Sequence, residues 1–252
     1  MGVRFSLTLA ILLLGIAVAR GAWKVVSSQT EESRAAGIEH RRIVLTETVS
    51  NEDATVDLAL FSTKSASLRV VDNPNGDDDL AAVMRRTRGT AGVNGGYFDP
   101  ENAPVGLLIS DGKMIAPLRR ARLLSGVLVV TKTRVDILRA GEYSSRKDVN
   151  AAVQCGPFLV EAGKPVAGLN NSRPARRTFV LTTESDRAAL GSCTAVTLAR
   201  LGDILATPEL KTRRALNLDG GSSSAFWFAG ERGVFSISEQ KTVRDFVIIV
   251  PR

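Results

Sequence analysis

The feature that most limits the fold of this chain is a series of short apolar runs separated by tight-turn signals. Within residues 55–62, Val56, Leu58 and Leu60 alternate with the smaller or polar Asp57 and Ala59, which is the period of a half-buried strand. The dipeptide Asp111-Gly112 stands between the apolar runs 105–110 and 113–116, and it is a strong hairpin signal. We expect further strands at 43–49, 66–72, 126–131, 133–139, 158–161, 164–166, 177–183, 215–218, 225–229, 234–237 and 243–250.

Only two segments carry the signals of a helix. The first follows the turn at 73–76, where three aspartates precede an apolar stripe, arginines follow it and Gly89 ends it. The second runs from about Thr197 to Ala206, with Thr197 as its cap. We therefore predict a single α+β domain over 43–252 that is dominated by strands, with a mixed sheet and about two principal helices.

The amino terminus indicates the compartment in which the protein works. Arg4 precedes an apolar stretch over 5–19, and small residues at 17–19 offer a cleavage site. This predicts a signal peptide over 1–22 and an exported protein, periplasmic or extracellular, with no stable membrane span after cleavage. An uncleaved segment that anchors the protein to the membrane is the alternative. Residues 23–42 are polar and lack periodicity, so we expect a linker or tail there.

Composition excludes several kinds of chemistry in this chain of 252 residues. His40 is the single histidine, which excludes a zinc site built from several histidines and leaves acid–base work mainly to carboxylates. We expect no metal and no cofactor. The net charge of +7 suits anionic partners, but the arginines are scattered without interleaved aromatics, so we expect no binding to nucleic acid.

The two cysteines, Cys155 and Cys193, leave two interpretations open. In an oxidising compartment they could form a disulfide that closes a long loop. Alternatively they are separate buried thiols that behave as small apolar side chains.

Three glycine-rich stretches are the candidates for a site. In the first, Asn94-Gly95-Gly96 lets the backbone approach a ligand, and Asp99 follows two aromatic residues, although Asn-Gly is also an ordinary turn. The second contains Gly156, ahead of a strand, and Gly-Pro in such a place usually marks an ordinary turn.

Downstream of Gly156, a group of arginines that includes Arg177 could bind a phosphate or be a solvated surface cluster. In the third stretch, an apolar strand leads to Asp219, followed by Gly220, Gly221 and Ser223. A carboxylate is often presented for catalysis or binding in this way.

In this order and spacing, the motifs resemble those of the phosphodiester glycosidase family. The resemblance covers roughly residues 55 to 250 and is most specific at Asn217-Leu218-Asp219-Gly220-Gly221. The chain departs from the family pattern in three places, with Cys155 in place of a serine, Ser222 in place of a common third glycine, and Lys241-x-Val243-x-Asp245 in place of Arg-x-Val-x-Asn.

The resemblance implies hydrolysis of a sugar-1-phosphodiester at the glycosidic bond, which releases free sugar and a phosphomonoester. The catalytic candidates are Asp219 and Asp99, because glycosidic cleavage uses carboxylates. The candidates for binding a phosphorylated glycan or sugar phosphodiester are Asn94, Gly95, Gly96, Gly156, Arg177, Gly220, Gly221 and Ser223. The alternatives are a non-catalytic envelope module that binds glycan or anionic polymer, and a phosphodiesterase that cuts the P–O bond.

Overall fold

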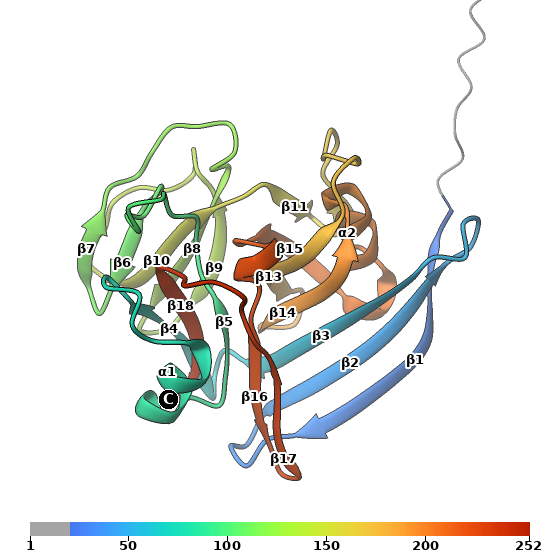
Figure 1. The fold of residues 1–252 in the computed structure, drawn as a ribbon, viewed down its shortest axis with the longest axis horizontal. Helices are drawn as coiled ribbons and strands as arrows, with labels where there is room; N and C mark the ends of the chain where they lie inside the picture. Colours follow the sequence, from blue (N-terminus) through green and yellow to red (C-terminus); the bar gives the residue numbers. More distant parts are fainter. Residues whose placement is uncertain (1–20) are drawn as a thin grey trace, which may run out of the picture.

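Three antiparallel sheets surround a shared apolar core in the computed structural model, which describes residues 21–252 (Figure 1). The predicted signal peptide lies almost wholly outside the described residues, because positions 1–20 are not among them. Within 21–252, no helix is both long enough and apolar enough to cross a bilayer.

The first sheet has eight strands in the order β1-β2-β3-β14-β13-β15-β11-β12. Figure 1 shows its first three strands as a long ribbon that projects from the rest of the protein. The strands are β1 (Trp23–Glu32), β2 (Ile38–Glu47), β3 (Asp53–Ser62), β14 (Arg187–Val196), β13 (Ala175–Thr183), β15 (Thr212–Asn217), β11 (Phe158–Glu161) and β12 (Lys164–Pro165).

The other two sheets have five strands each. One consists of β7 (Lys113–Ala116), β6 (Leu108–Ser110), β10 (Val149–Cys155), β8 (Gly126–Thr131) and β9 (Val135–Arg139), in that order. The order in the other is β17 (Gly233–Ile237), β16 (Phe226–Gly230), β5 (Ala91–Asn94), β18 (Asp245–Pro251) and β4 (Ala66–Asp72).

The core lies where the three sheets face one another. One apolar cluster takes Leu216 from the first sheet, Val153 from the second and Val247 from the third, each at most 1% exposed. Burial of one such side chain contributes roughly 1.5–3 kcal/mol. The apolar run at the end of the chain is β18, which pairs with both β4 and β5 and is therefore central, as its composition predicts.

The two predicted helices are confirmed. Helix α1 (Leu80–Thr87) begins after Asp79, whose carboxylate accepts a hydrogen bond from the Ala82 N–H at 2.6 Å. Helix α2 (Leu198–Leu205) begins after Thr197, whose hydroxyl accepts from the Arg200 N–H at 3.3 Å. A single 3-10 turn, Pro208–Leu210, follows α2.

The strand-dominated α+β class is confirmed, but the predictions of a mixed sheet and of a linker over 23–42 are wrong. Every pairing among the described strands is antiparallel, so the mixed sheet is replaced by three antiparallel sheets. The expected linker over 23–42 is largely strand, because β1 and most of β2 lie there. Most side chains of β1 are exposed, so this strand exists through its pairing with β2 and has no apolar period that could reveal it.

Cys155 and Cys193 are free and buried, so the structure has the separate thiols and no disulfide. They belong to different apolar clusters, and burial raises the pKa of Cys193 to about 12 and that of Cys155 further.

We expect the native protein to resist thiol reagents at pH 8, because both thiols are protonated and covered. After denaturation without a reductant, mass spectrometry should find both cysteines labelled. Failure to label the unfolded chain would show that the two sulfurs are bonded.

Candidate active site

The predicted motifs meet where strand ends of all three sheets converge. Asn94 ends β5, Asp245 begins β18, Thr178 lies near the start of β13, Asn217 ends β15 and Cys155 ends β10. The first and third glycine-rich stretches, which are more than a hundred residues apart in the chain, are joined by a backbone hydrogen bond of 3.0 Å from the Asp219 N–H to the Gly95 carbonyl.

The Asn94 side chain fixes the loop that carries Asp219. It is fully buried, and its Nδ2 donates to the Asp219 carbonyl at 2.8 Å. Its Oδ1 accepts from the Thr178 hydroxyl at 2.8 Å and from the Ala225 N–H at 3.0 Å. The side chain has no exposed surface and positions the Asp219 loop, while a direct contact with substrate stays a prediction.

Gly95 and Gly96 make room for Asp245. A Cβ atom on Gly95 would lie 1.7 Å from Asp245 Oδ1, so no other residue fits without displacing this carboxylate. The Gly95 N–H donates to the Asp245 carbonyl at 2.8 Å, and the Gly96 N–H donates to Asp245 Oδ1 at 3.1 Å. The two glycines were predicted to bind substrate, but their N–H groups are engaged inside the protein.

Gly156 has a similar internal role. Its carbonyl accepts from the Tyr97 hydroxyl at 2.5 Å and from Asn217 Nδ2 at 2.9 Å. A Cβ on Gly156 would lie 2.1 Å from the Leu123 carbonyl oxygen. Burial, with added repulsion from Cys155 and Asp219, raises the pKa of Tyr97, so this phenol stays neutral and acts as a donor.

Asp219 is the half-buried carboxylate at the centre of this arrangement. Its Oδ1 accepts from the Gly220 N–H at 2.9 Å, and the turn Gly221–Ser223 follows it. Burial raises the pKa of Asp219, while the Ser223 hydroxyl, the Gly220 N–H and the Lys241 charge oppose that rise. A Cβ on Gly221 would meet no atom within 4 Å, so the loop backbone beside the carboxylate faces open space.

Arg177 supplies a cation on the other side of Gly220. A Cβ on Gly220 would lie 3.9 Å from Arg177 Cδ, which places the two residues side by side. The guanidinium donates to the carbonyls of Val196 at 2.9 Å and Arg173 at 2.5 Å, and within residues 21–252 it forms no ion pair. Burial lowers the pKa of Arg177, as expected for a charge without a counter-ion.

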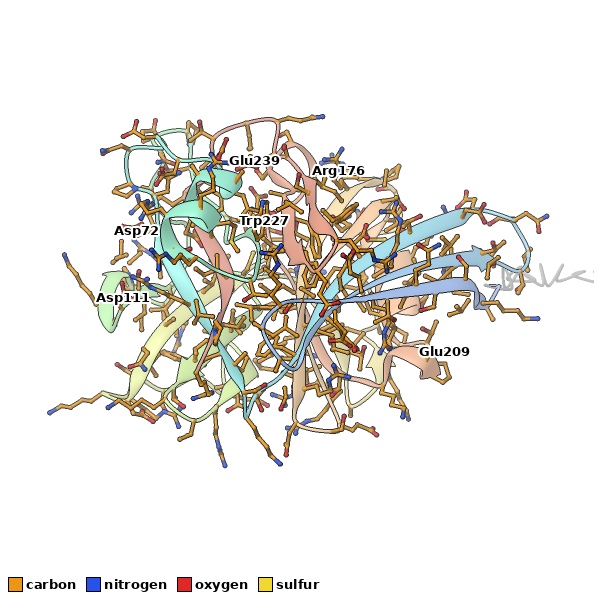
Figure 2. All side chains as sticks on the ribbon, turned by 90° about the horizontal axis from the view of Figure 1, so that it is seen from below. Asp72, Asp111, Arg176, Glu209, Trp227 and Glu239 are labelled. Carbon is orange, nitrogen blue, oxygen red and sulfur yellow. The ribbon has the colours of Figure 1, made fainter. Side chains whose placement is uncertain are left out.

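A loop from the end of the chain forms the rim of the site. Figure 2 shows Arg176 and Glu239 on the same side of the molecule. Arg176 Nη1 donates to the Ser238 carbonyl at 3.5 Å, and Glu239 accepts from the Leu80 N–H of α1 at 2.7 Å. These contacts hold the segment that carries Lys241. The Nζ atom of Lys241 lies 4.8 Å from the centre of the Phe98 ring.

Asp99 closes a turn. Its Oδ1 accepts from the N–H groups of Glu101 at 3.1 Å and Ala103 at 2.8 Å. No hydrogen bond joins it to Asp219 among the described residues, so a catalytic part for Asp99 stays a prediction. Within residues 21–252, no group of three or more His, Cys, Asp or Glu side chains is placed so that it could bind a metal ion.

Asp245 is the carboxylate that the sequence did not single out as part of the site. It is 1% exposed, and burial raises its pKa to about 7, with Asp72 and Asp219 adding repulsion and the Gly96 N–H and Arg244 opposing it. The one available signal was its place in the terminal motif, where the family has asparagine. A protonated carboxyl has the same shape as that amide and can also donate a hydrogen bond.

We expect Asp245→Asn to make stability less sensitive to pH. The unfolded carboxyl ionises near 3.8 and the folded one near 7, so the wild type loses stability as the pH rises between these values. The variant avoids that loss, and its amide oxygen can still accept from Gly96. The melting temperature of the variant minus that of the wild type should therefore be at least about 5 °C larger at pH 8 than at pH 5. Equal differences at both pH values would contradict a neutral Asp245.

We expect Arg177→Lys to weaken recognition of an anionic substrate. Lysine keeps the charge but loses the planar fork that binds two oxygens at once, so KM should rise about tenfold. Steady-state kinetics on a sugar-1-phosphodiester test this, with Arg34→Lys, at an exposed arginine between β1 and β2, as the control. Unchanged kinetics in the Arg177 variant would remove this side chain from the site.

Comparison with known proteins places these motifs in a family. The family model described as phosphodiester glycosidase matches residues 87–250. The chain is also 32% identical over 91 residues to the uncharacterised protein YigE of Escherichia coli, and this match spans 33% of the chain and 36% of that relative.

Solved structures share the fold. A zebrafish N-acetylglucosamine-1-phosphodiester alpha-N-acetylglucosaminidase catalytic domain, auto-inhibited by its pro-peptide, matches with a TM-score of 0.66 at 16% identity over 92% of this chain and 89% of that one. A hypothetical protein from Synechocystis gives 0.64 at 15% identity, over 90% of this chain and 64% of that chain. A putative exported protein from Burkholderia pseudomallei gives 0.57 at 13% identity, over 80% and 75%.

Proposed function

Because this chain belongs to the phosphodiester glycosidase family, we propose that it hydrolyses the glycosidic bond of a sugar-1-phosphodiester and releases free sugar and a phosphomonoester. The observation that carries the proposal is that Asp219 and Arg177 both lie next to Gly220, without forming an ion pair with each other. One is a half-buried carboxylate and the other a guanidinium without a counter-ion among the described residues. A phosphodiester linked to an anomeric carbon needs both kinds of group.

The two side chains have separate tasks in this proposal. Arg177 binds the phosphodiester oxygens through its free Nη1 edge and stabilises the charge that grows on the departing phosphate. Asp219 stabilises the oxocarbenium-like sugar, either as nucleophile or base or by its charge alone. A phosphomonoester is a good leaving group, so the scheme does not depend on strong acid assistance from a second carboxylate.

The proposal includes export to the periplasm or the extracellular space. The leader pattern over 1–22 supports it, and a structural neighbour from Burkholderia pseudomallei carries the name of a putative exported protein.

Product analysis tests the reaction. The purified protein is incubated with sugar-1-phosphodiesters in oxygen-18 water, and the products are identified by mass spectrometry. Free sugar that carries the label, together with an unlabelled phosphomonoester, supports the glycosidase. Sugar-1-phosphate whose phosphate group carries the label would identify a phosphodiesterase. Binding without turnover would identify a non-catalytic module.

A further inference from the structure

A groove of about 680 Å³ lies at the opposite ends of the strands that form the candidate active site. We call it the basic groove, because six cationic side chains line it against two carboxylates, Asp136 and Asp186. The cations are Lys64, Arg134, Arg187, Arg213, Arg214 and Arg252. They come from hairpin turns and strand ends of different sheets, so the fold gathers them from distant parts of the sequence.

Three of these cations have no carboxylate partner within residues 21–252. The guanidinium groups of Arg134 and Arg213 are exposed and form neither an ion pair nor a side-chain hydrogen bond there. The Arg252 guanidinium donates only to neutral carbonyls, through Nε to Thr63 at 3.0 Å and Ala66 at 3.1 Å and through Nη1 to Lys132. These charges are therefore available to an anion.

The other cations are compensated to different degrees. Arg187 lies 3.1 Å from Glu39, and Arg214 lies 2.8 Å from Glu142. Lys64 and Asp186 are 4.0 Å apart and both strongly exposed, which makes that pair weak. The groove thus keeps a net positive charge after its internal ion pairs are counted.

The basic groove is separate from the site around Asp219. Strand β13 passes Arg177 near its start and ends at Thr183, which lines the groove. At the usual rise of a strand, these two residues are about 20 Å apart. One small substrate cannot contact both places at once.

The remaining lining indicates the kind of anion. Four threonines contribute hydroxyls, and none of the lining residues is aromatic. Single-stranded nucleic acids are usually held by stacking of bases on aromatic rings, which this groove lacks. Arginines with threonines suit phosphate oxygens and sugar hydroxyls, because guanidinium groups bind phosphates through two parallel hydrogen bonds.

We propose that the basic groove is a second anion site, which binds phosphate groups of a phosphorylated glycan chain. The choice of a glycan as carrier rests on the proposed function, whereas the binding of phosphate rests on the groove alone. Such a site holds a long substrate at a distance from the reacting bond.

Binding measurements test this without turnover, so their outcome does not depend on whether the hydrolase assay succeeds. Calorimetric titration of the full protein with phosphorylated dextran should show saturable binding that weakens with salt, and unmodified dextran should not bind. Arg134→Gln/Arg213→Gln should bind the phosphorylated polymer at least tenfold more weakly. Both residues are exposed, and circular dichroism should confirm that the fold is intact.

The matched control is Arg34→Gln/Arg85→Gln, which removes two exposed arginines from outside the groove. Its affinity should equal that of the wild type. Equal losses in both double variants would show that only the overall charge matters and would overturn the proposal. So would an absence of binding, or tighter binding of a thymidine oligonucleotide of the same charge at the groove arginines.

Discussion

Asp219→Asn should reduce kcat and kcat/KM together by a factor of a hundred or more, with little change in melting temperature. The amide can still accept the Gly220 N–H at its oxygen, so the local geometry is retained while the charge is lost. A group that acts mainly in the transition state affects both kinetic parameters when it is removed. The expected size is that of a positioned acid–base or nucleophilic group.

Turnover and thermal unfolding of the same preparation decide between catalysis and structure. If Asp219 only closed its loop, the asparagine variant would keep its activity and lose about 1 kcal/mol of stability. Glu209→Gln serves as the control, because that exposed carboxylate follows helix α2 and lies outside both the site and the basic groove. An active but less stable Asp219 variant would sink the catalytic assignment.

Gly95→Ala should have the largest effect on stability. The added Cβ would meet Asp245 Oδ1 at 1.7 Å and the Asp245 carbonyl oxygen at 3.0 Å, and this buried residue has no room to move. Overpacking in such a place costs about 3 kcal/mol, which corresponds to a melting temperature lower by roughly 6–12 °C.

Two further variants separate this clash from the general effect of removing a glycine. Gly141→Ala should be nearly neutral, because a Cβ there meets nothing within 4 Å. Asp245→Ala combined with Gly95→Ala should recover part of the loss, since the truncated side chain no longer meets the added methyl group. If the double variant were the sum of the two single ones, the contact between these residues would not be the cause.

Local signals predicted much of the fold and of the motifs. Turn dipeptides such as Asp111-Gly112 and caps such as Thr197 act through the backbone of a few neighbouring residues, so they can be recognised without knowledge of the whole structure. The glycines of the Asn94 and Asp219 motifs are required by close approaches, and they too stand out in the sequence.

Features that depend on distant pairing were missed. Strand β1 has no apolar period, and β14 buries small residues such as Gly191 that give little strand signal. The burial of Asp245 follows from the position of β18 between two strands, and nothing local announces it. The internal roles of Asn94 and Gly156 likewise depend on partners far along the chain.

The convergence of three sheets at one point has a consequence for how activity arises during folding. Contacts within any single sheet leave the Asp219 loop without the Asn94 clamp or without the arginine beside it, because these come from different sheets. Pairings between distant segments form slowly compared with local ones. Turnover would therefore be acquired late, and no excised fragment that lacks the first or the third sheet would retain it.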